Sequence, residues 1–240
     1  MDRFKAHMKI AVILKKTIIL VLVLLVPGFL YYLLVSKGKN RYLNLPVYGP
    51  KTVLKTTHKV GHNDVPDTLY HTLPDFKLTD QDGNTITPKT FSKKIFIANF
   101  FYTHCKGLCD QMNTSINQLA TGYAASKMVY FVSISVDPQR DSVKALKNYA
   151  NVIKPASSRW LFLTGDTAAI YPLAHNGFLV NALQSDNDNF IYSDKLMLID
   201  GELRIRGYYS GASTSDMIKL GDEIKVLIKE EVLKNDTPMY

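Results

Sequence analysis

The chain has 240 residues, a formal net charge of +8 and two cysteines, and 46% of its residues are hydrophobic while 21% are charged. These values are close to those of globular proteins and exclude a collagen-like, mucin-like or low-complexity chain. The length predicts one ordinary domain plus additional segments, with enough residues to bury a core without disulfide bonds.

The N-terminal part contains an uncharged apolar run over residues 17–35. At about 1.5 Å per residue, a helix of this length spans roughly 28 Å, which is enough to cross a bilayer. The apolar run is long, and residues 36–39 lack the Ala-x-Ala pattern of a signal-peptidase site, so we expect a retained transmembrane anchor rather than a cleaved signal peptide. Five basic residues precede the run and three follow it closely. This asymmetry favours a cytoplasmic basic tail over residues 1–16.

The positive charge is unevenly distributed along the chain. Residues before Asp64 carry 11 bases and one acid, a net charge of +10, whereas the rest carries 18 bases and 20 acids, a net charge of −2. The predicted domain is therefore not basic, and we expect no nucleic-acid partner. The basic stretch after the anchor is instead interpreted as a juxtamembrane segment close to anionic lipid headgroups.

Predicted elements after the anchor follow an α/β order. Residues 36–72 show no sustained periodicity and are interpreted as a juxtamembrane linker, and the domain is placed over 73–235. An Asp82-Gly83 turn predicts a hairpin between 76–78 and 85–87. We then predict strands over 95–101, 129–135, 160–163, 195–199 and 203–208, and helices over 109–119, 142–149, 167–176 and 215–234. The order βαβ followed by ββα suits a thioredoxin-like fold.

Both cysteines lie in one motif, Cys105-x3-Cys109, between the first buried strand and the helix after it. Backbone N–H groups and the helix dipole at such a junction can lower the pKa of a thiol. One helical turn or a tight loop brings the two sulfurs close enough to bond to each other or to share an ion. The pair therefore suits Cu(I), a reversible dithiol–disulfide couple, or an inert local disulfide.

The run Phe100-Phe101-Tyr102-Thr103-His104-Cys105-Lys106-Gly107-Leu108-Cys109, followed by Asp137-Pro138-Gln139-Arg140-Asp141, resembles the Sco/SenC family of membrane-anchored, thioredoxin-like copper proteins. The resemblance extends over most of the chain after the anchor. It implies a thioredoxin-like fold, binding of one copper ion by two cysteines and a distant histidine, and a part in assembling the copper centre of cytochrome oxidase. It also implies a bacterial inner-membrane protein whose domain lies on the periplasmic, extracytoplasmic side.

The chain departs from the family pattern at three positions. Lys106 and Asp110 replace the prolines that follow each cysteine in the family, and Tyr192 stands where the resemblance places the ligand histidine. A phenol is a poor ligand for Cu(I), whereas an imidazole is a good one. We therefore expect a divergent member that lacks the third ligand, in which the two thiolates alone hold Cu(I).

Seven further side chains receive minor interpretations. His104 is adjacent to Cys105 and is a candidate substitute ligand or thiol activator, whereas His175 more simply caps the end of its predicted helix. Asp137 receives a secondary role in orienting the cysteine pair, and Asp141 or Ser142 is expected to cap the helix that follows. Arg204 and Arg206 occupy alternate strand positions, and their shared face is expected to be solvated.

The sequence leads to three functional hypotheses. The first is a membrane-tethered, copper-binding thiol protein that delivers Cu(I) to a cytochrome oxidase copper subunit. The second is a thiol-disulfide oxidoreductase that acts on another thiol protein, has lost copper binding, and uses Cys105, expected to be the more exposed sulfur, as the attacking thiol. The third is a degenerate membrane-tethered scaffold in which the cysteines are dispensable.

Overall fold

The computed structural model describes residues 2–37, 44–60, 63–180, 182–184, 190–192 and 194–236. The chain divides into two compact units, Met1–Leu43 and Asn44–Tyr240, and each is described by itself. In the first unit, helix α1 (Asp2–Lys37) contains the stretch Leu14–Leu33, which has a mean hydropathy of 2.1. This stretch is long and apolar enough to cross a membrane, and it overlaps the predicted anchor over 17–35.

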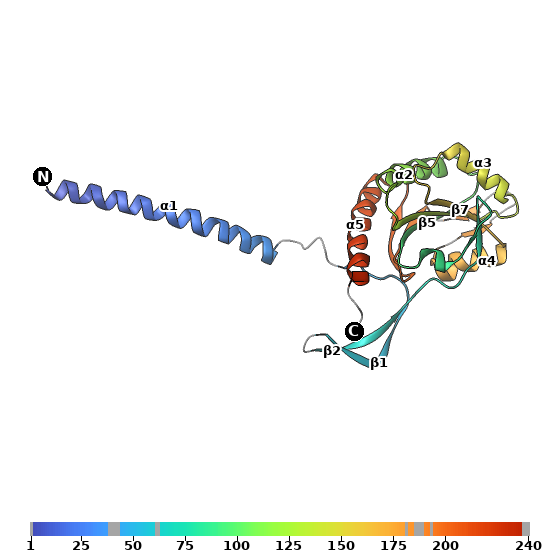
Figure 1. The fold of residues 1–240 in the computed structure, drawn as a ribbon, viewed down its shortest axis with the longest axis horizontal. Helices are drawn as coiled ribbons and strands as arrows, with labels where there is room; N and C mark the ends of the chain where they lie inside the picture. Colours follow the sequence, from blue (N-terminus) through green and yellow to red (C-terminus); the bar gives the residue numbers. More distant parts are fainter. Residues whose placement is uncertain are drawn as a thin grey trace. The chain divides into compact units, whose positions relative to one another are not determined.

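The second unit is built on a seven-stranded mixed sheet with the order β11-β10-β5-β6-β7-β3-β4 (Figure 1). The three central strands β5, β6 and β7 are parallel, and the outer pairs are antiparallel. The strands are β3 (Leu78–Asp80), β4 (Thr85–Ile86), β5 (Ile95–Phe101), β6 (Val129–Ser135), β7 (Trp160–Thr164), β10 (Lys195–Ile199) and β11 (Ile205–Ser210). The apolar runs form the central strands because both faces of the sheet are buried there.

Helices cover both faces of this sheet. The helices are α2 (Leu108–Gly122), α3 (Val143–Ile153), α4 (Thr167–Pro172) and α5 (Thr214–Asp236). Ile97 and Phe101 of β5 pack in one core with apolar residues of α2, α3 and α5, whereas Phe96 and Phe100 pack in the other core with Ile170 of α4. Alternate residues of one strand point to opposite faces, and the two cores follow from that alternation. The predicted α/β order is confirmed.

Residues 36–72 differ from the prediction of a linker without regular structure. β1 (Lys51–Val60) and β2 (Asn63–Tyr70) form an antiparallel two-stranded ribbon that projects from the domain in Figure 1. The prediction missed the ribbon because its described side chains are exposed or half-buried, and a ribbon without a buried face gives little apolar alternation. The compact unit accordingly begins at Asn44, before the predicted domain start at Leu73.

Two further segments differ from the prediction. The expected helix over 167–176 divides into α4 and a π-helical turn, η2 (Leu173–Gly177). Pro172 lies at the junction and has no N–H to donate to the preceding turn, so the regular α-helical pattern ends there. The segment before β10 also contains a short hairpin that the sequence did not predict, formed by β8 (Ala182–Gln184) and β9 (Phe190–Tyr192).

Arg204 and Arg206 are not solvated, contrary to the sequence interpretation. The side chain of Arg206 is only 3% exposed, and Arg206 Nη1 donates to Asp200 Oδ2 at 3.0 Å while Nη2 donates to Glu230 Oε2 at 2.7 Å. Arg204 Nε donates to the same Asp200 oxygen at 2.9 Å. Arg206 also donates to the carbonyl oxygens of Leu45 and Pro46. The stretch that contains Leu45 and Pro46, called the entry segment below, therefore covers this face and is tied to the sheet through a buried ion network.

Candidate functional site

Cys105 and Cys109 are joined by a disulfide, and their Cα atoms lie 5.8 Å apart. Cys105 lies in the loop after β5, and Cys109 lies in the first turn of α2. Both residues are buried, with 4% and 2% of their surfaces exposed. The sequence expectation that Cys105 is the more exposed residue thus corresponds to a very small difference, which does not identify an attacking sulfur.

Two residues set the start of α2: Gly107, which lies between the two cysteines, and Asp110, which follows Cys109. Gly107 adopts a φ of 65°, a left-handed conformation that favours glycine. Asp110 Oδ2 accepts a hydrogen bond from Gly107 N at 3.1 Å, which satisfies one of the free N–H groups at the helix start. Asp110 therefore supplies a local constraint at a position where the family pattern has proline, while Lys106 is exposed.

Asp141 ties the cysteine loop to the neighbouring strand. Its carboxylate accepts hydrogen bonds from Thr103 N at 3.0 Å, from Thr103 Oγ1 at 2.5 Å and from Ser135 Oγ at 2.5 Å. Thr103 lies two residues before Cys105, and Ser135 is the last residue of β6. Asp137 instead forms an ion pair with Arg140, so the described contacts to the cysteine loop come from Asp141. The sequence showed Asp141 only as a helix-cap candidate, and the structure assigns that cap to Ser142 Oγ, which accepts from Ala145 N.

The turn between β11 and α5 packs against α2, the helix that carries Cys109. Gln111 Nε2 donates to Ala212 O at 3.1 Å, and a Cβ atom on Gly211 would lie 3.0 Å from Cγ of Met112. Gly211 N in turn donates to Asp194 O at 3.0 Å. These contacts link Asp194, which lies directly before β10 and two residues after Tyr192, to the helix that carries Cys109.

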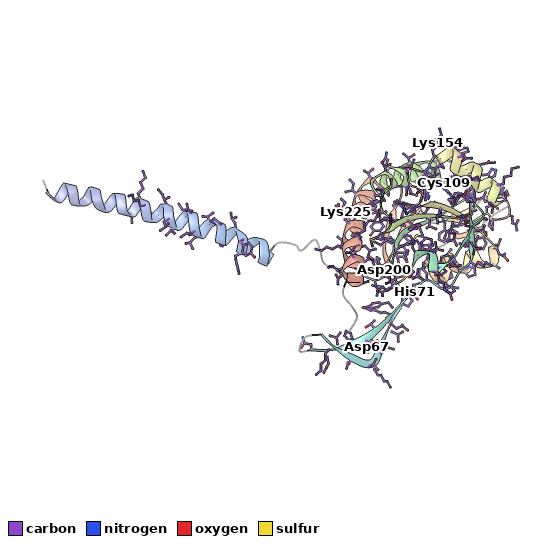
Figure 2. The ribbon with its side chains drawn as sticks, viewed as in Figure 1. Asp67, His71, Cys109, Lys154, Asp200 and Lys225 are labelled. Carbon is purple, nitrogen blue, oxygen red and sulfur yellow. A yellow bond between two sulfur atoms is a disulfide. The ribbon has the colours of Figure 1, made fainter. Side chains whose placement is uncertain are left out.

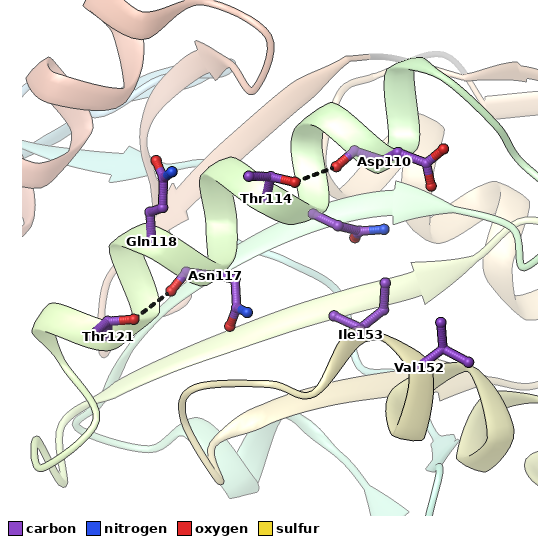
Figure 3. A pocket seen from close by; sticks show the side chains of 8 residues that line it. Asp110, Thr114, Asn117, Gln118, Thr121, Val152 and Ile153 are labelled. Atoms are coloured by element: carbon purple, nitrogen blue, oxygen red, sulfur yellow. Dashed lines mark hydrogen bonds between the residues drawn. The ribbon is translucent and has the colours of Figure 1, made fainter.

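A surface groove of about 390 Å³ lies between α2 and α3 and has Asp110 in its lining (Figure 3). Several of its polar side chains already bond within the protein. Thr114 Oγ1 donates to Asp110 O, Thr121 Oγ1 donates to Asn117 O, and Asn113 Nδ2 donates to the hydroxyl of Tyr149. The groove thus combines polar side chains of α2 with Val152 and Ile153 of α3, and its link to the disulfide is Asp110, the residue that follows Cys109.

Most of the chain matches one known protein family. The SCO1/SenC family model matches residues 66–228 of the 240-residue chain. The chain belongs to the SCO1/SenC family. The match includes both cysteines, the Asp137–Asp141 loop and the strands of the main sheet.

Individual relatives of this SCO1/SenC chain agree with that assignment. The SCO1 protein homologue of Bacillus subtilis is 24% identical over 168 residues, which cover 69% of this chain and 87% of the relative. A SCO1/SenC family lipoprotein from Bacillus anthracis has 28% identity and a TM-score of 0.61, covering 65% of this chain and 95% of that structure. Copper-bound ScoI from Bradyrhizobium japonicum has 26% identity and a TM-score of 0.54, covering 65% and 99%. The predicted thioredoxin-like fold is confirmed by these likenesses.

His104 and His175, the two histidines considered as a third ligand, lie in different parts of the domain. His104 is exposed beside the cysteine pair, and its Nδ1 lies 3.1 Å from Thr103 Oγ1. His175 is exposed in η2, whose buried residues belong to the core on the opposite face of the sheet from the cysteines. The backbone of Tyr192 pairs with Ala182 at the end of β9, and its side chain lies outside the described part of the structure. His104 is thus the candidate that the fold places next to the cysteines.

The donor chemistry of this SCO1/SenC site fits Cu(I). Among the described residues, no group of three His, Cys, Asp or Glu side chains is arranged to hold a metal ion. When reduced, Cys105 and Cys109 supply two soft thiolates from positions whose Cα atoms are 5.8 Å apart, and soft thiolates favour Cu(I). The residues that would hold the ion are therefore these two cysteines.

Proposed function

We propose that this chain is a membrane-tethered copper-binding thiol protein that assists assembly of the copper centre of cytochrome c oxidase. Proteins of the SCO1/SenC family are copper-binding assembly proteins of this oxidase. The observation that carries the proposal is the pairing of Cys105 and Cys109 in the strand-to-helix loop of a Sco fold. Copper is the cargo of this activity, and the two thiolates are its ligands.

Copper loading requires reduction of the disulfide first. A dithiol partner donates two electrons and becomes a disulfide itself, while Cys105 and Cys109 gain two electrons and two protons. Each thiol then releases its proton as it binds Cu(I), because the thiolate is the form that binds a metal. Delivery to an oxidase copper subunit proceeds by exchange of these thiolates for ligands of the recipient.

The membrane topology is part of the proposal. The apolar stretch of α1 crosses a bacterial inner membrane once, with residues 1–16 on the cytoplasmic side and the domain on the periplasmic side. The excess of basic residues before the span supports this orientation. The domain would then work in the compartment where disulfides form and persist.

An anaerobic Cu(I) competition titration of the reduced full chain in detergent tests the proposal. We expect one Cu(I) per chain, bound with sub-micromolar affinity, and loss of this binding in Cys105→Ser. If position 192 contributes no ligand, Tyr192→His strengthens binding and adds Cu(II) affinity, because imidazole is a good copper ligand. Failure of the wild-type chain to bind one Cu(I) would contradict the proposed function.

The formed disulfide favours a second candidate function, thiol-disulfide exchange with another protein. Exchange requires a reduction potential within reach of the surrounding thiol couples, and a potential well below about −300 mV marks an inert structural bond. We expect the Cys105–Cys109 potential to lie above that limit. A lower value would remove this candidate.

A further inference from the structure

The buried carboxylate of Asp141 has a different environment from an ordinary helix cap. Asp141 is 0% exposed, although aspartate is rarely buried completely unless it is paired. Its described hydrogen-bond donors are two hydroxyl groups and one backbone N–H, all of them neutral. Within the described ranges of the chain, no ion pair compensates this carboxylate.

Two of the three donors belong to one residue, Thr103, which lies in the loop that leads to Cys105. The third belongs to Ser135, at the end of the strand next to β5. Ser142 caps α3, so the burial of Asp141 is not explained by helix capping. A fully buried carboxylate that bonds across 38 residues to the cysteine loop fixes the position of that loop relative to the sheet.

We propose that Asp141 is a positioning residue that holds the Thr103–Cys105 segment in the geometry in which Cys105 and Cys109 form their disulfide. A loop held in place keeps the two sulfurs near each other after reduction, which raises their effective concentration. The three hydrogen bonds that Asp141 accepts from Thr103 and Ser135, called the Asp141 clamp below, therefore favour the disulfide over the dithiol. This inference rests on the proposed function only in treating the pair as a working redox couple.

The equilibrium with glutathione measures this effect without copper. In that reaction two glutathione molecules lose two electrons and form one disulfide, while Cys105–Cys109 gains two electrons and two protons. Removing the Asp141 clamp lowers the equilibrium constant for closing the Cys105–Cys109 disulfide. For Asp141→Ala we expect about a tenfold decrease, which corresponds to a potential about 30 mV less negative.

The test uses the full chain in detergent, equilibrated in glutathione buffers, with the thiol fraction counted by mass-tagged alkylation. Thr103→Val removes one of the three hydrogen bonds with little change in shape, and we expect a smaller decrease in the same direction. This second variant keeps the test valid if Asp141→Ala fails to fold. Ser142→Ala is the matched control, because it removes the neighbouring helix cap without touching Thr103.

A role in stability alone gives a different result. Such a role destabilises the oxidised and reduced chains equally, so the glutathione equilibrium constant of Asp141→Ala and Thr103→Val would equal that of wild type. That result, or an equal shift in Ser142→Ala, would overturn the inference. The glutathione experiment and the copper titration test different proposals. An unchanged glutathione equilibrium constant would overturn the role of Asp141 but not Cu(I) binding. A failed Cu(I) titration would overturn copper binding but not the role of Asp141.

Discussion

Two aspartates of this domain, Asp141 and Asp200, are both completely buried but have contrasting partners. Asp200 accepts from the guanidinium groups of Arg204 and Arg206, whereas Asp141 accepts from two hydroxyls and one backbone N–H. Asp141 lies at the sheet edge where β5 leads into the cysteine loop. Asp200 follows β10, which is antiparallel to β5, so it lies at the opposite edge. Figure 2 labels Asp200 and Cys109 at separate places in the domain.

The contrast shows how the same buried group serves two purposes. At Asp200 the opposite charges compensate one another, and the network attaches the entry segment and α5 to the sheet. At Asp141 the carboxylate bonds with neutral groups close to the Cys105–Cys109 disulfide. Burying a carboxylate without a cation is costly, so a position that retains it points to a role beyond stability. We therefore expect substitutions at Asp200's network to affect folding and substitutions at Asp141 to affect the disulfide.

The largest expected effect is that of Arg206→Met. Removing this guanidinium leaves the buried carboxylate of Asp200 and the half-buried carboxylate of Glu230 with fewer partners, and breaking a buried ion pair costs about 3–5 kcal/mol. Urea unfolding of the full chain, followed by the fluorescence of the single tryptophan, Trp160, measures this loss. The glutathione equilibrium of Cys105–Cys109 should remain that of wild type.

The exposed pair of Lys225 and Asp222 provides the control for this prediction. Their side chains are 70% and 63% exposed, and exposed ion pairs contribute little to stability. Lys225→Met should therefore change the unfolding free energy by less than about 0.5 kcal/mol. A changed glutathione equilibrium in Arg206→Met would contradict the proposal that the Asp200 network affects folding alone and that only the Asp141 side affects the disulfide.

A smaller effect is expected for Tyr209→Phe, which removes a hydrogen bond to Glu223. The surroundings of the Glu223 carboxylate are intermediate between those of Asp200 and Asp141. The buried phenol of Tyr209 donates to Glu223, and Lys219 Nζ lies 3.8 Å from the same carboxylate. Burial, together with the hydrogen bond to Glu223, raises the pKa of Tyr209 well above its ordinary value. Tyr209→Phe should cost about 1.5–2 kcal/mol at about pH 8, because it removes a hydrogen bond to a charged group.

The pH dependence of the Tyr209 effect follows from the direction of its pKa shift. A raised folded-state pKa contributes stability that is fully present below the unfolded pKa near 10 and is lost as the pH rises. The difference in unfolding free energy between wild type and Tyr209→Phe should thus shrink by about 1.4 kcal/mol at about pH 11. A difference that stays constant between these pH values would show that Tyr209 titrates normally.

The sequence predicted the central strands and the cysteine pair because their signals are local. Apolar runs such as Ile95–Phe101 identify buried strands, and the two cysteines lie four residues apart. The two buried networks were not predicted, because their members are distant in sequence. Asp141 meets a threonine 38 residues earlier, and Arg206 meets Leu45 161 residues earlier. Alternation placed the two arginines on one face, but it could not show that the entry segment covers that face.

The central claim is that Cys105 and Cys109 hold copper in a chain with tyrosine at position 192. X-ray absorption spectroscopy of the Cu(I)-loaded full chain tests it most directly, because sulfur and imidazole ligands give distinct signals. We expect two sulfur ligands on the copper of the wild-type chain, no imidazole signal from position 192, which is tyrosine, and an added imidazole signal in Tyr192→His. A wild-type spectrum without sulfur ligands, or one unchanged in Cys105→Ser, would show that these two cysteines do not hold the copper.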